Sequence, residues 1–233
     1  MTQHQRSVSR QVSSNQLLPH PKLEQIVKRH LHSEFKRPIA AHNQNVFEST
    51  LRHTENKKVI FDSGCGTGTS TLLIAKNNPA AVVIGIDKSA HRLSKNSVSE
   101  KQSDNALLVR ADLIDFLRLA VKHNIKLYKH FILYPNPWPK KQHFIRRWHG
   151  SPVFTDILKL GGSLELRSNW PLYVTEFAQA LLCAGQRADT FNVRDSMQPF
   201  ISDFEAKYFN SGHQLIGLRA KLNVDSKAGA NDN

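Results

Sequence analysis

The stretch from Val59 to Gly68 reads VIFDSGCGTG, and it decides the fold class of this chain. Its apolar start is typical of a short buried strand, and a helical stretch follows from Ser70 to Lys76. Between them stand the glycines Gly64, Gly66 and Gly68. Glycine tolerates positive φ and lets a ligand approach the backbone, so strand, glycine turn and helix together predict a nucleotide site. The dinucleotide fingerprint needs a further glycine where this chain has Thr69, so the match to an NAD site is imperfect.

Acidic residues end the first three predicted strands. Asp62 ends the first, Asp87 follows the strand Ala81 to Ile86, and Asp112 follows the strand Ala106 to Ala111. The carboxyl ends of parallel strands line the ligand crevice of an open α/β sheet, so we expect the three acids to converge on one ligand. An ionised carboxylate at the second strand end suits the two hydroxyls of a ribose. The alternative is that these acids only cap the helices that follow them.

The later segments complete a predicted sheet. We expect strands at Phe131 to Tyr134, Ser163 to Arg167, Thr190 to Val193 and Leu215 to Ala220, with helices at Val153 to Leu160 and Tyr173 to Ala184. The fold class is therefore α/β, a mostly parallel seven-strand sheet with helices on both faces and an antiparallel pair at one edge.

A rigid, basic and aromatic loop follows the fourth predicted strand. Residues 134–141 read YPNPWPKK, and His143, Arg146, Arg147 and Trp148 come soon after. The three prolines fix φ and bias the residues before them toward extended geometry, so Asn136 and Trp138 should stand on a stiff backbone. A proline-rich turn with a packed tryptophan is the plainer interpretation.

The ends of the chain differ from its centre. Residues 1–20 are rich in Gln, Ser and Asn and carry no apolar periodicity near their start, so they predict a disordered basic arm that could help to capture RNA. Apolar residues at helical spacing predict an N-terminal helical extension over residues 21–56. The catalytic domain is expected at residues 57–222, and residues 223–233 read as a flexible tail.

Composition favours a nucleic-acid partner. The chain has 32 Lys and Arg against 19 Asp and Glu, a formal charge of +13, and its basic residues cluster at residues 140–147 and 28–37. A solvated basic face is the alternative. Two cysteines and scattered histidines make neither a disulfide framework nor a metal site, so we predict no metal. With no apolar run of membrane length and no secretory signal, we expect no membrane contact, a cytoplasmic location and a monomer.

These motifs resemble a known family. The glycine turn with its strand-end acids is similar to the class I, Rossmann-like methyltransferases that use S-adenosylmethionine, and the Pro-Asn-Pro-Trp-Pro-Lys run resembles that of the tRNA (guanine-N7)-methyltransferases that act on position 46. The run Ser202-Asp203-Phe204-Glu205 is similar to the family's Thr-x-Phe/Tyr-Glu substrate loop. The resemblance implies cofactor contacts from the residues Asp62, Gly64, Gly66, Gly68, Asp87, Asp112 and Asn136. It implies contacts with the target nucleotide in tRNA from the residues Lys140, Asn169, Ser202 and Glu205.

Two departures from the family concern its acids. Asn136 stands where the family motif has Asp, and Asn169 stands where a second Asp follows the fifth strand. A carboxylate accepts from two guanine N–H groups at once, whereas an amide offers one oxygen, so we expect reduced or altered activity with Asn136 as the catalytic residue. An Asn at this place also resembles the Asn-Pro-Pro-aromatic motif of amino-methyltransferases, although Trp138 and Pro139 stand in the opposite order. The alternatives are a diverged paralogue that methylates another base or an amine, and an RNA-binding homologue without catalysis.

Overall fold

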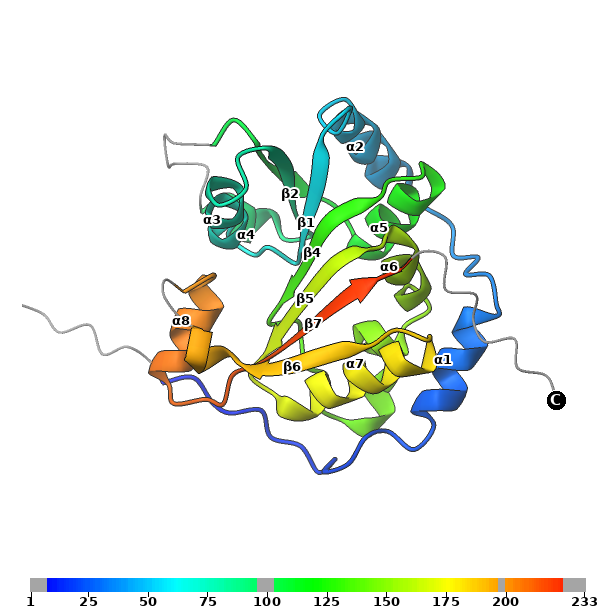
Figure 1. Ribbon diagram of the computed structural model, residues 1–233, viewed down its shortest axis with the longest axis vertical. Coiled ribbons are helices and arrows are strands. Elements are labelled where there is room, and N and C mark those ends of the chain that lie inside the picture. The colour runs from blue at the N-terminus through cyan, green and yellow to red at the C-terminus, as the bar shows by residue number, and fades with distance from the viewer. Residues whose placement is uncertain (1–7, 96–102, 197–199, 224–233) are drawn as a thin grey trace, which may run out of the picture.

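A single mixed sheet of seven strands forms the centre of the computed structural model, which describes residues 8–95, 103–196 and 200–223 (Figure 1). The strand order is β3-β2-β1-β4-β5-β7-β6. The strands are β1 (Lys58–Ser63), β2 (Ala81–Asp87), β3 (Ala106–Arg110), β4 (Leu127–Leu133), β5 (Gly162–Ser168), β6 (Ala188–Asn192) and β7 (Ile216–Leu222). β7 runs antiparallel between β5 and β6, and the other neighbours are parallel, so the predicted fold class is confirmed.

Helices cover the two faces of the sheet unequally. The helices are α1 (Leu23–Leu31), α2 (Ala41–Leu51), α3 (Thr69–Lys76), α4 (Ala90–Leu93), α5 (Leu113–Lys122), α6 (Phe154–Leu160), α7 (Pro171–Cys183) and α8 (Asp203–Asn210), with 3₁₀ turns at Lys141–Arg146, Trp148–Gly150 and Val193–Ser196. One hydrophobic cluster joins α1, α2, α5, α6 and α7 to one face, and a smaller one joins α3 and the α8 region to the other. The helices α1 and α2 lie within residues 21–56, where the sequence predicts an N-terminal helical extension.

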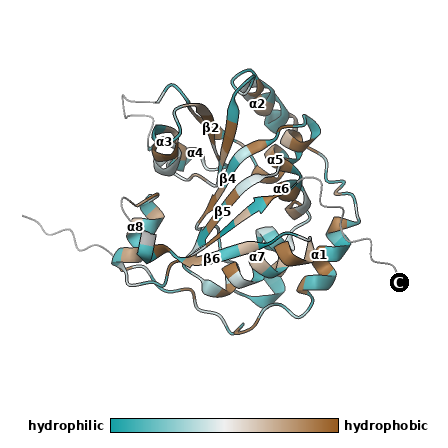
Figure 2. Cartoon of the chain, in the orientation of Figure 1, coloured by the Kyte–Doolittle hydropathy of each residue, from teal (hydrophilic) through white to brown (hydrophobic). Residues whose placement is uncertain are grey.

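The burial of the central strands explains the layering. Every residue of β2 is buried, which is typical of a parallel strand that is covered on both faces. Gly85 of β2 lets α3 lie close, since a Cβ at that position would stand 2.2 Å from Oγ1 of Thr71. Toward the other edge, β5 and β7 have mixed hydropathy, and the charged side chains Glu165, Arg219 and Lys221 are at least partly exposed (Figure 2).

The N-terminal arm departs from the prediction. Residues 8–20 carry no regular secondary structure, yet Ser9, Ser14, Gln16 and His20 form hydrogen bonds to residues more than 100 positions away in the sequence. The prediction of disorder is therefore wrong for residues 8–20, because buried polar groups of the catalytic domain supply partners for the arm. Residues 1–7, like residues 224–233 of the predicted flexible tail, lie outside the described part of the chain.

Candidate functional site

A cavity of about 610 Å³ lies where the parallel strands end. Its wall draws on the ends of β1, β2 and β3, on the loop after β4 and on α8; its lining residues include Ser63, Gly64, Asp87, Lys88, Asp112, Leu113, Asn136, Trp138, Phe204 and Tyr208. Figure 1 shows α8 at this end of the sheet, apart from the helices that pack on the large core. A cavity of this size at the carboxyl ends of parallel strands is the usual place for a ligand in an α/β fold.

The glycine turn has the backbone geometry that its sequence predicts. Gly64, Gly66 and Gly68 have φ values of +85°, +62° and +89°. The turn is tied to the second strand, because the N–H groups of Gly64 and Cys65 both donate to the carbonyl of Ile86, at 2.8 and 3.2 Å. A Cβ at Gly64 would have Cδ1 of Leu113 as its nearest neighbour, 3.9 Å away, so the bare backbone there leaves space on the cavity side. The turn therefore offers a ligand an open backbone surface.

Asp62 supports the turn from behind. Its side chain is buried, and its Oδ2 accepts hydrogen bonds from the hydroxyls of Ser70 and Thr71 at 2.6 and 2.7 Å. Its Oδ1 is also buried and has no hydrogen-bond partner among the described residues. Burial raises the pKa of this carboxyl to about 6, against the lowering effect of the two hydroxyls. Asp62 does not line the cavity, so the structure gives it a supporting position rather than a direct contact.

Asp87 lines the cavity and already holds three donors. Its Oδ2 accepts from the N–H of Gly66 at 3.0 Å, and its Oδ1 accepts from the N–H of Ser89 and from Nη2 of Arg92, both at 2.8 Å. A carboxylate has about four acceptor positions, so some capacity remains for a hydroxyl of a ligand. Arg92 is a neighbour that the sequence prediction missed, and its guanidinium takes up one acceptor position of Asp87.

Asp112 combines the two roles that the sequence left open. It caps α5 by accepting from the N–H groups of Ile114 and Asp115 at 3.0 and 3.3 Å, and it also lines the cavity. Arg37 donates to the same carboxylate at 2.9 Å and also pairs with Asp115. The second basic cluster of the sequence is therefore partly neutralised at Arg37 rather than free for a phosphate.

The loop after β4 presents its amide and its indole to the cavity. Asn136 is exposed and lines the cavity together with Trp138, and the guanidinium of Arg146 lies 4.7 Å from the indole centroid. Tyr134 and Trp138, which each precede a proline, have φ values of +51° and +46°. The expected extended geometry is therefore wrong at Trp138. A non-glycine residue in this region costs about 1–3 kcal/mol, so the surroundings must stabilise the loop.

A buried ion pair supplies that stabilisation. Nε and Nη2 of Arg147 donate to the carbonyl of Trp138 at 3.2 and 3.0 Å, while Nη1 donates to Glu176. Both charged side chains are fully buried, and Nε2 of His149 lies 3.0 Å from the same carboxylate. Burial alone would raise the pKa of Glu176, but the hydrogen bond from His149 and the charge of Arg147 lower it to about 2. Glu176 therefore stays ionised and keeps Arg147 in place.

The α8 segment places its aromatic residues in the cavity and its polar residues elsewhere. Phe204 and Tyr208 line the cavity, with their rings 6.1 Å apart in a stacked arrangement. Ser202 is the N-cap of α8, where its hydroxyl accepts from the N–H of Glu205 at 3.1 Å. Glu205 is fully buried and accepts from Arg167, from the hydroxyl of Tyr134 and from the N–H of Ile201. In this structure neither polar side chain forms the wall of the cavity.

Two further residues that the resemblance assigns to the nucleotide stand outside the lining. Lys140 is exposed on the basic segment after Trp138. Asn169 follows β5, and its Nδ2 lies 3.0 Å from Nδ1 of His213. The sequence thus identified the strand ends and Asn136 as lining residues, but it missed Phe204 and Tyr208 as aromatic walls. Their spacing of four residues, which brings two side chains together on a helix, would have been the available signal.

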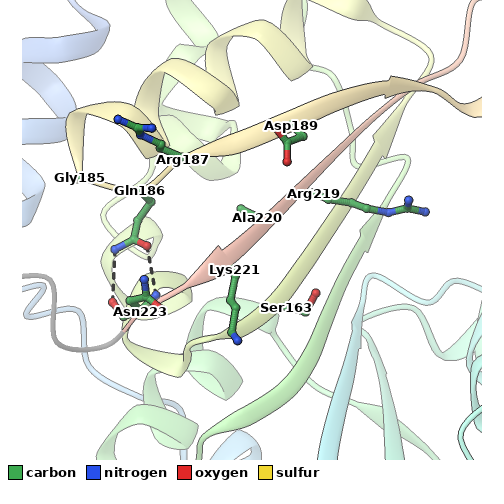
Figure 3. Close-up of a pocket in the computed structure, with 9 residues that line it drawn as sticks. All are labelled: Ser163, Gly185, Gln186, Arg187, Asp189, Arg219, Ala220, Lys221 and Asn223. Carbon is green, nitrogen blue, oxygen red and sulfur yellow. Dashed lines mark hydrogen bonds between the residues drawn. The ribbon is translucent and has the colours of Figure 1, made fainter.

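A second hollow, of about 520 Å³, lies at the edge formed by β6 and β7. Its basic side chains, Arg187, Arg219 and Lys221, point away from one another (Figure 3). Ser163, near the start of β5, lies in its wall, so this hollow is at the opposite end of the sheet from the glycine turn. It therefore lacks the converging groups of a binding site.

Within residues 8–95, 103–196 and 200–223, no group of three or more His, Cys, Asp or Glu residues is placed to hold a metal ion. In the same part of the chain, no helix is long and apolar enough to cross a membrane.

Comparison with known proteins adds to this geometry. The model of a family described as "Putative methyltransferase" matches residues 56–218. The chain is 30% identical over 173 residues to a tRNA (guanine-N(7)-)-methyltransferase from Nitrosococcus oceani, which covers 72% of each protein. It is 28% identical to a protein of the same name from Mycolicibacterium gilvum, over 52% of this chain and 49% of that one.

Solved structures agree at the level of the fold. A 16S rRNA (adenine(1408)-N(1))-methyltransferase from Catenulisporales acidiphilia, in a structure with its cosubstrate SAM, aligns with 78% of this chain and 93% of its own. The TM-score is 0.56 and the sequence identity is 16%. The two chains therefore share the arrangement of sheet and helices.

Proposed function

The chain belongs to this methyltransferase family, and we propose that it transfers the methyl group of S-adenosylmethionine to N7 of a guanine in tRNA. One observation carries the proposal: a single cavity joins the glycine turn and Asp87 to Asn136, Trp138 and two aromatic residues of α8. The glycine turn and Asp87 suit a nucleoside cofactor, whereas Asn136, Trp138 and the aromatic residues of α8 suit a flat base.

The residues present fit S-adenosylmethionine. The turn from Gly64 to Gly68 offers an open backbone, and Asp87 offers acceptors at the place where ribose hydroxyls would bind. Asp112 and Leu113 form the adjoining wall and Asp62 supports the turn. When bound, this cofactor supplies an electrophilic methyl group on a positively charged sulfur.

The rest of the cavity fits the acceptor. Trp138, Phe204 and Tyr208 provide aromatic surface for a base that leaves its stack. The exposed Asn136 provides an amide oxygen that can accept from a guanine N–H. Methylation at N7 uses a ring lone pair and removes no proton, so no general base is needed. The residues contribute by positioning the base and by stabilising its developing positive charge.

The basic surface beside the cavity supports an RNA substrate. Lys88 and Arg146 line the cavity, and Lys140 is exposed next to it. Together with the formal charge of +13, these residues favour contact with phosphates. We propose that Lys140 contacts the RNA, that the protein works as a monomer, and that it is cytoplasmic. Sedimentation of the free protein tests the oligomeric state.

The deciding experiment uses two transcripts of one tRNA. Labelled methyl transfer from S-adenosylmethionine is measured to the ordinary transcript and to one made with 7-deazaguanosine, which has C–H in place of N7. We expect label only in the ordinary transcript, with aniline cleavage at one site. Transfer to both transcripts would contradict N7 as the acceptor and favour a diverged enzyme for another atom.

The variant Asn136→Asp tests the role of the amide. A carboxylate accepts two guanine N–H bonds where the amide oxygen accepts fewer, so we expect faster methylation of the ordinary transcript. Loss of transfer in a folded variant would favour an amine acceptor. No transfer by either form, with tRNA and cofactor both bound, would favour the non-catalytic RNA-binding homologue.

A further inference from the structure

The N-terminal arm crosses the molecule beside the loop after β4, residues 134–141, which is called the catalytic loop from here on. Starting near α8, it passes Pro139 and reaches the buried pair of Arg147 and Glu176 before α1 begins. Figure 1 shows the arm in blue, running along the lower edge from the α8 side toward α1. The arm contacts residues that lie far from it in the sequence. Several of these residues form or support the wall of the cavity.

Gln16 provides the firmest anchor of the arm. Its Oε1 accepts from Nη2 of Arg147 at 3.0 Å, and its Nε2 donates to Oε1 of Glu176 at 2.7 Å. The amide of Gln16 therefore forms a hydrogen bond with each member of the buried ion pair. The N–H of His20 donates to the same carboxylate at 2.8 Å, and its ring stacks on Phe144 with centroids 4.4 Å apart.

The guanidinium of Arg147 connects Gln16 to the catalytic loop. The same Nη2 of Arg147 that meets Gln16 also donates to the carbonyl of Trp138. Two residues earlier in the arm, the hydroxyl of Ser14 donates to the carbonyl of Pro139 at 2.7 Å. The arm therefore holds the carbonyl of Pro139 directly, through Ser14, and the carbonyl of Trp138 indirectly, through Arg147. Because Trp138 is in a costly left-handed conformation, these contacts oppose its relaxation.

A second path leads from the arm to Asn169. The carbonyl of Ser9 lies 2.9 Å from Nε2 of His213, and a carbonyl can only accept, so this nitrogen carries the proton. Nδ1 of the ring lies 3.0 Å from Nδ2 of Asn169 and accepts from that amide. The arm thereby selects the tautomer of His213, which in turn fixes which end of the Asn169 amide faces the ring. The oxygen of that amide is left as an acceptor for another partner.

We propose that residues 9–20 form a strap that positions the methyl-transfer site, with Gln16 and His213 as positioning residues. The strap holds the loop at Trp138 in its strained conformation and turns Asn169 so that it offers an acceptor. This inference rests on the proposed function for its effect on turnover, but its effect on the conformation of Trp138 is independent of any activity.

The test replaces Gln16 and leaves the ion pair intact. Gln16→Ala and the similarly sized Gln16→Met remove the two hydrogen bonds of the amide to the ion pair, together with its bond to the carbonyl of Leu18, and Asn15→Ala changes an exposed neighbour on the same arm. For both Gln16 variants we expect kcat at saturating tRNA to fall about tenfold, with the Kd for tRNA within twofold of wild type, because misplacement affects the transition state. Asn15→Ala should match wild type in both quantities.

Fluorine NMR supplies the readout that does not need activity. The protein labelled with 5-fluorotryptophan has three indole signals, assigned by single Trp→Phe changes. We expect the Trp138 signal to shift or broaden in the Gln16 variants and to stay unchanged in Asn15→Ala. An unchanged Trp138 signal would overturn the proposal. So would weaker tRNA binding with unaltered kcat, which would make the arm an RNA contact only.

The two proposals fail in different ways. If wild type transfers no methyl to tRNA while the Gln16 variants perturb Trp138, the proposed function fails and the strap stands. If wild type is active and the Gln16 variants match it in kcat and in the Trp138 signal, the strap fails and the function stands.

Discussion

The burial of His130 should make the folded protein lose stability below about pH 6.5, well above the pH at which most carboxylates titrate. This residue of β4 is fully buried, with Nε2 2.8 Å from the hydroxyl of Ser63 and with Nδ1 lacking a partner among the described residues. Burial lowers its pKa from 6.5 to about 3. The unfolded chain therefore takes up a proton below pH 6.5 that the folded chain resists, so stability is complete above that value and is lost as the pH falls toward 3.

The magnitude follows from the size of the shift. Each pH unit below 6.5 removes about 1.4 kcal/mol until the folded pKa is reached, so His130 lowers the free energy of unfolding by about 2 kcal/mol between pH 7 and pH 5. Urea unfolding gives the free energy of unfolding of wild type and His130→Gln at pH 7 and pH 5. The effect of His130 is the loss between these pH values in wild type minus the loss in the variant. The direct cost of the substitution and the titration of other groups, such as Asp62, largely cancel in this comparison.

An exposed histidine provides the control. His53→Gln lies outside the core and should keep the pH dependence of wild type. We expect His130→Gln to lose about 2 kcal/mol less than both between pH 7 and pH 5. Equal losses in His130→Gln and wild type would refute the reasoning, because they would show that the buried ring is protonated without cost.

Three further predictions concern the site. Arg92→Gln should tighten binding of S-adenosylmethionine about fivefold in calorimetry, because it removes a competitor for Asp87 worth about 1 kcal/mol; weaker binding would show that Arg92 contacts the cofactor instead. Phe204→Ala should lower kcat/KM for tRNA about tenfold or more with cofactor affinity unchanged, since base stacking is worth about 1–3 kcal/mol, and unaltered kinetics would count against stacking. Glu205→Gln should reduce the free energy of unfolding by about 3 kcal/mol in urea, because it leaves Arg167 buried with fewer negative partners; a near-neutral effect would mean that Glu165 suffices for Arg167.

The sequence predicted the parts of the fold that depend on local patterns. The strand, glycine turn and helix from Val59 onward, and the acids at successive strand ends, follow from periodicity and from the freedom of glycine. The start of β4 at Leu127 was missed, because Lys129 and His130 interrupt its apolar pattern. Side-chain partners from other strands accommodate such residues, and no local pattern shows them.

The features that the sequence did not predict depend on partners far along the chain. The arm is ordered because Glu176 and Arg147, more than 100 residues later, satisfy Gln16. Glu205 stands outside the cavity wall, where Arg167 and Tyr134 donate to its carboxylate. Composition correctly described the arm as polar. A polar segment is still ordered where buried polar groups of the folded domain need it as a hydrogen-bond partner.

The contact of Asn169 with His213 gives a physical reason for an amide at position 169, where the sequence resemblance implies an acid. A carboxylate at that position would have only acceptors to offer, so it would set an acceptor against Nδ1 of His213, while Nε2 donates to the carbonyl of Ser9. The amide instead donates to Nδ1 through its Nδ2 and still keeps one oxygen as an acceptor. Asn136 is exposed and has no such constraint, so of the two amides it is the one whose change to Asp should raise turnover.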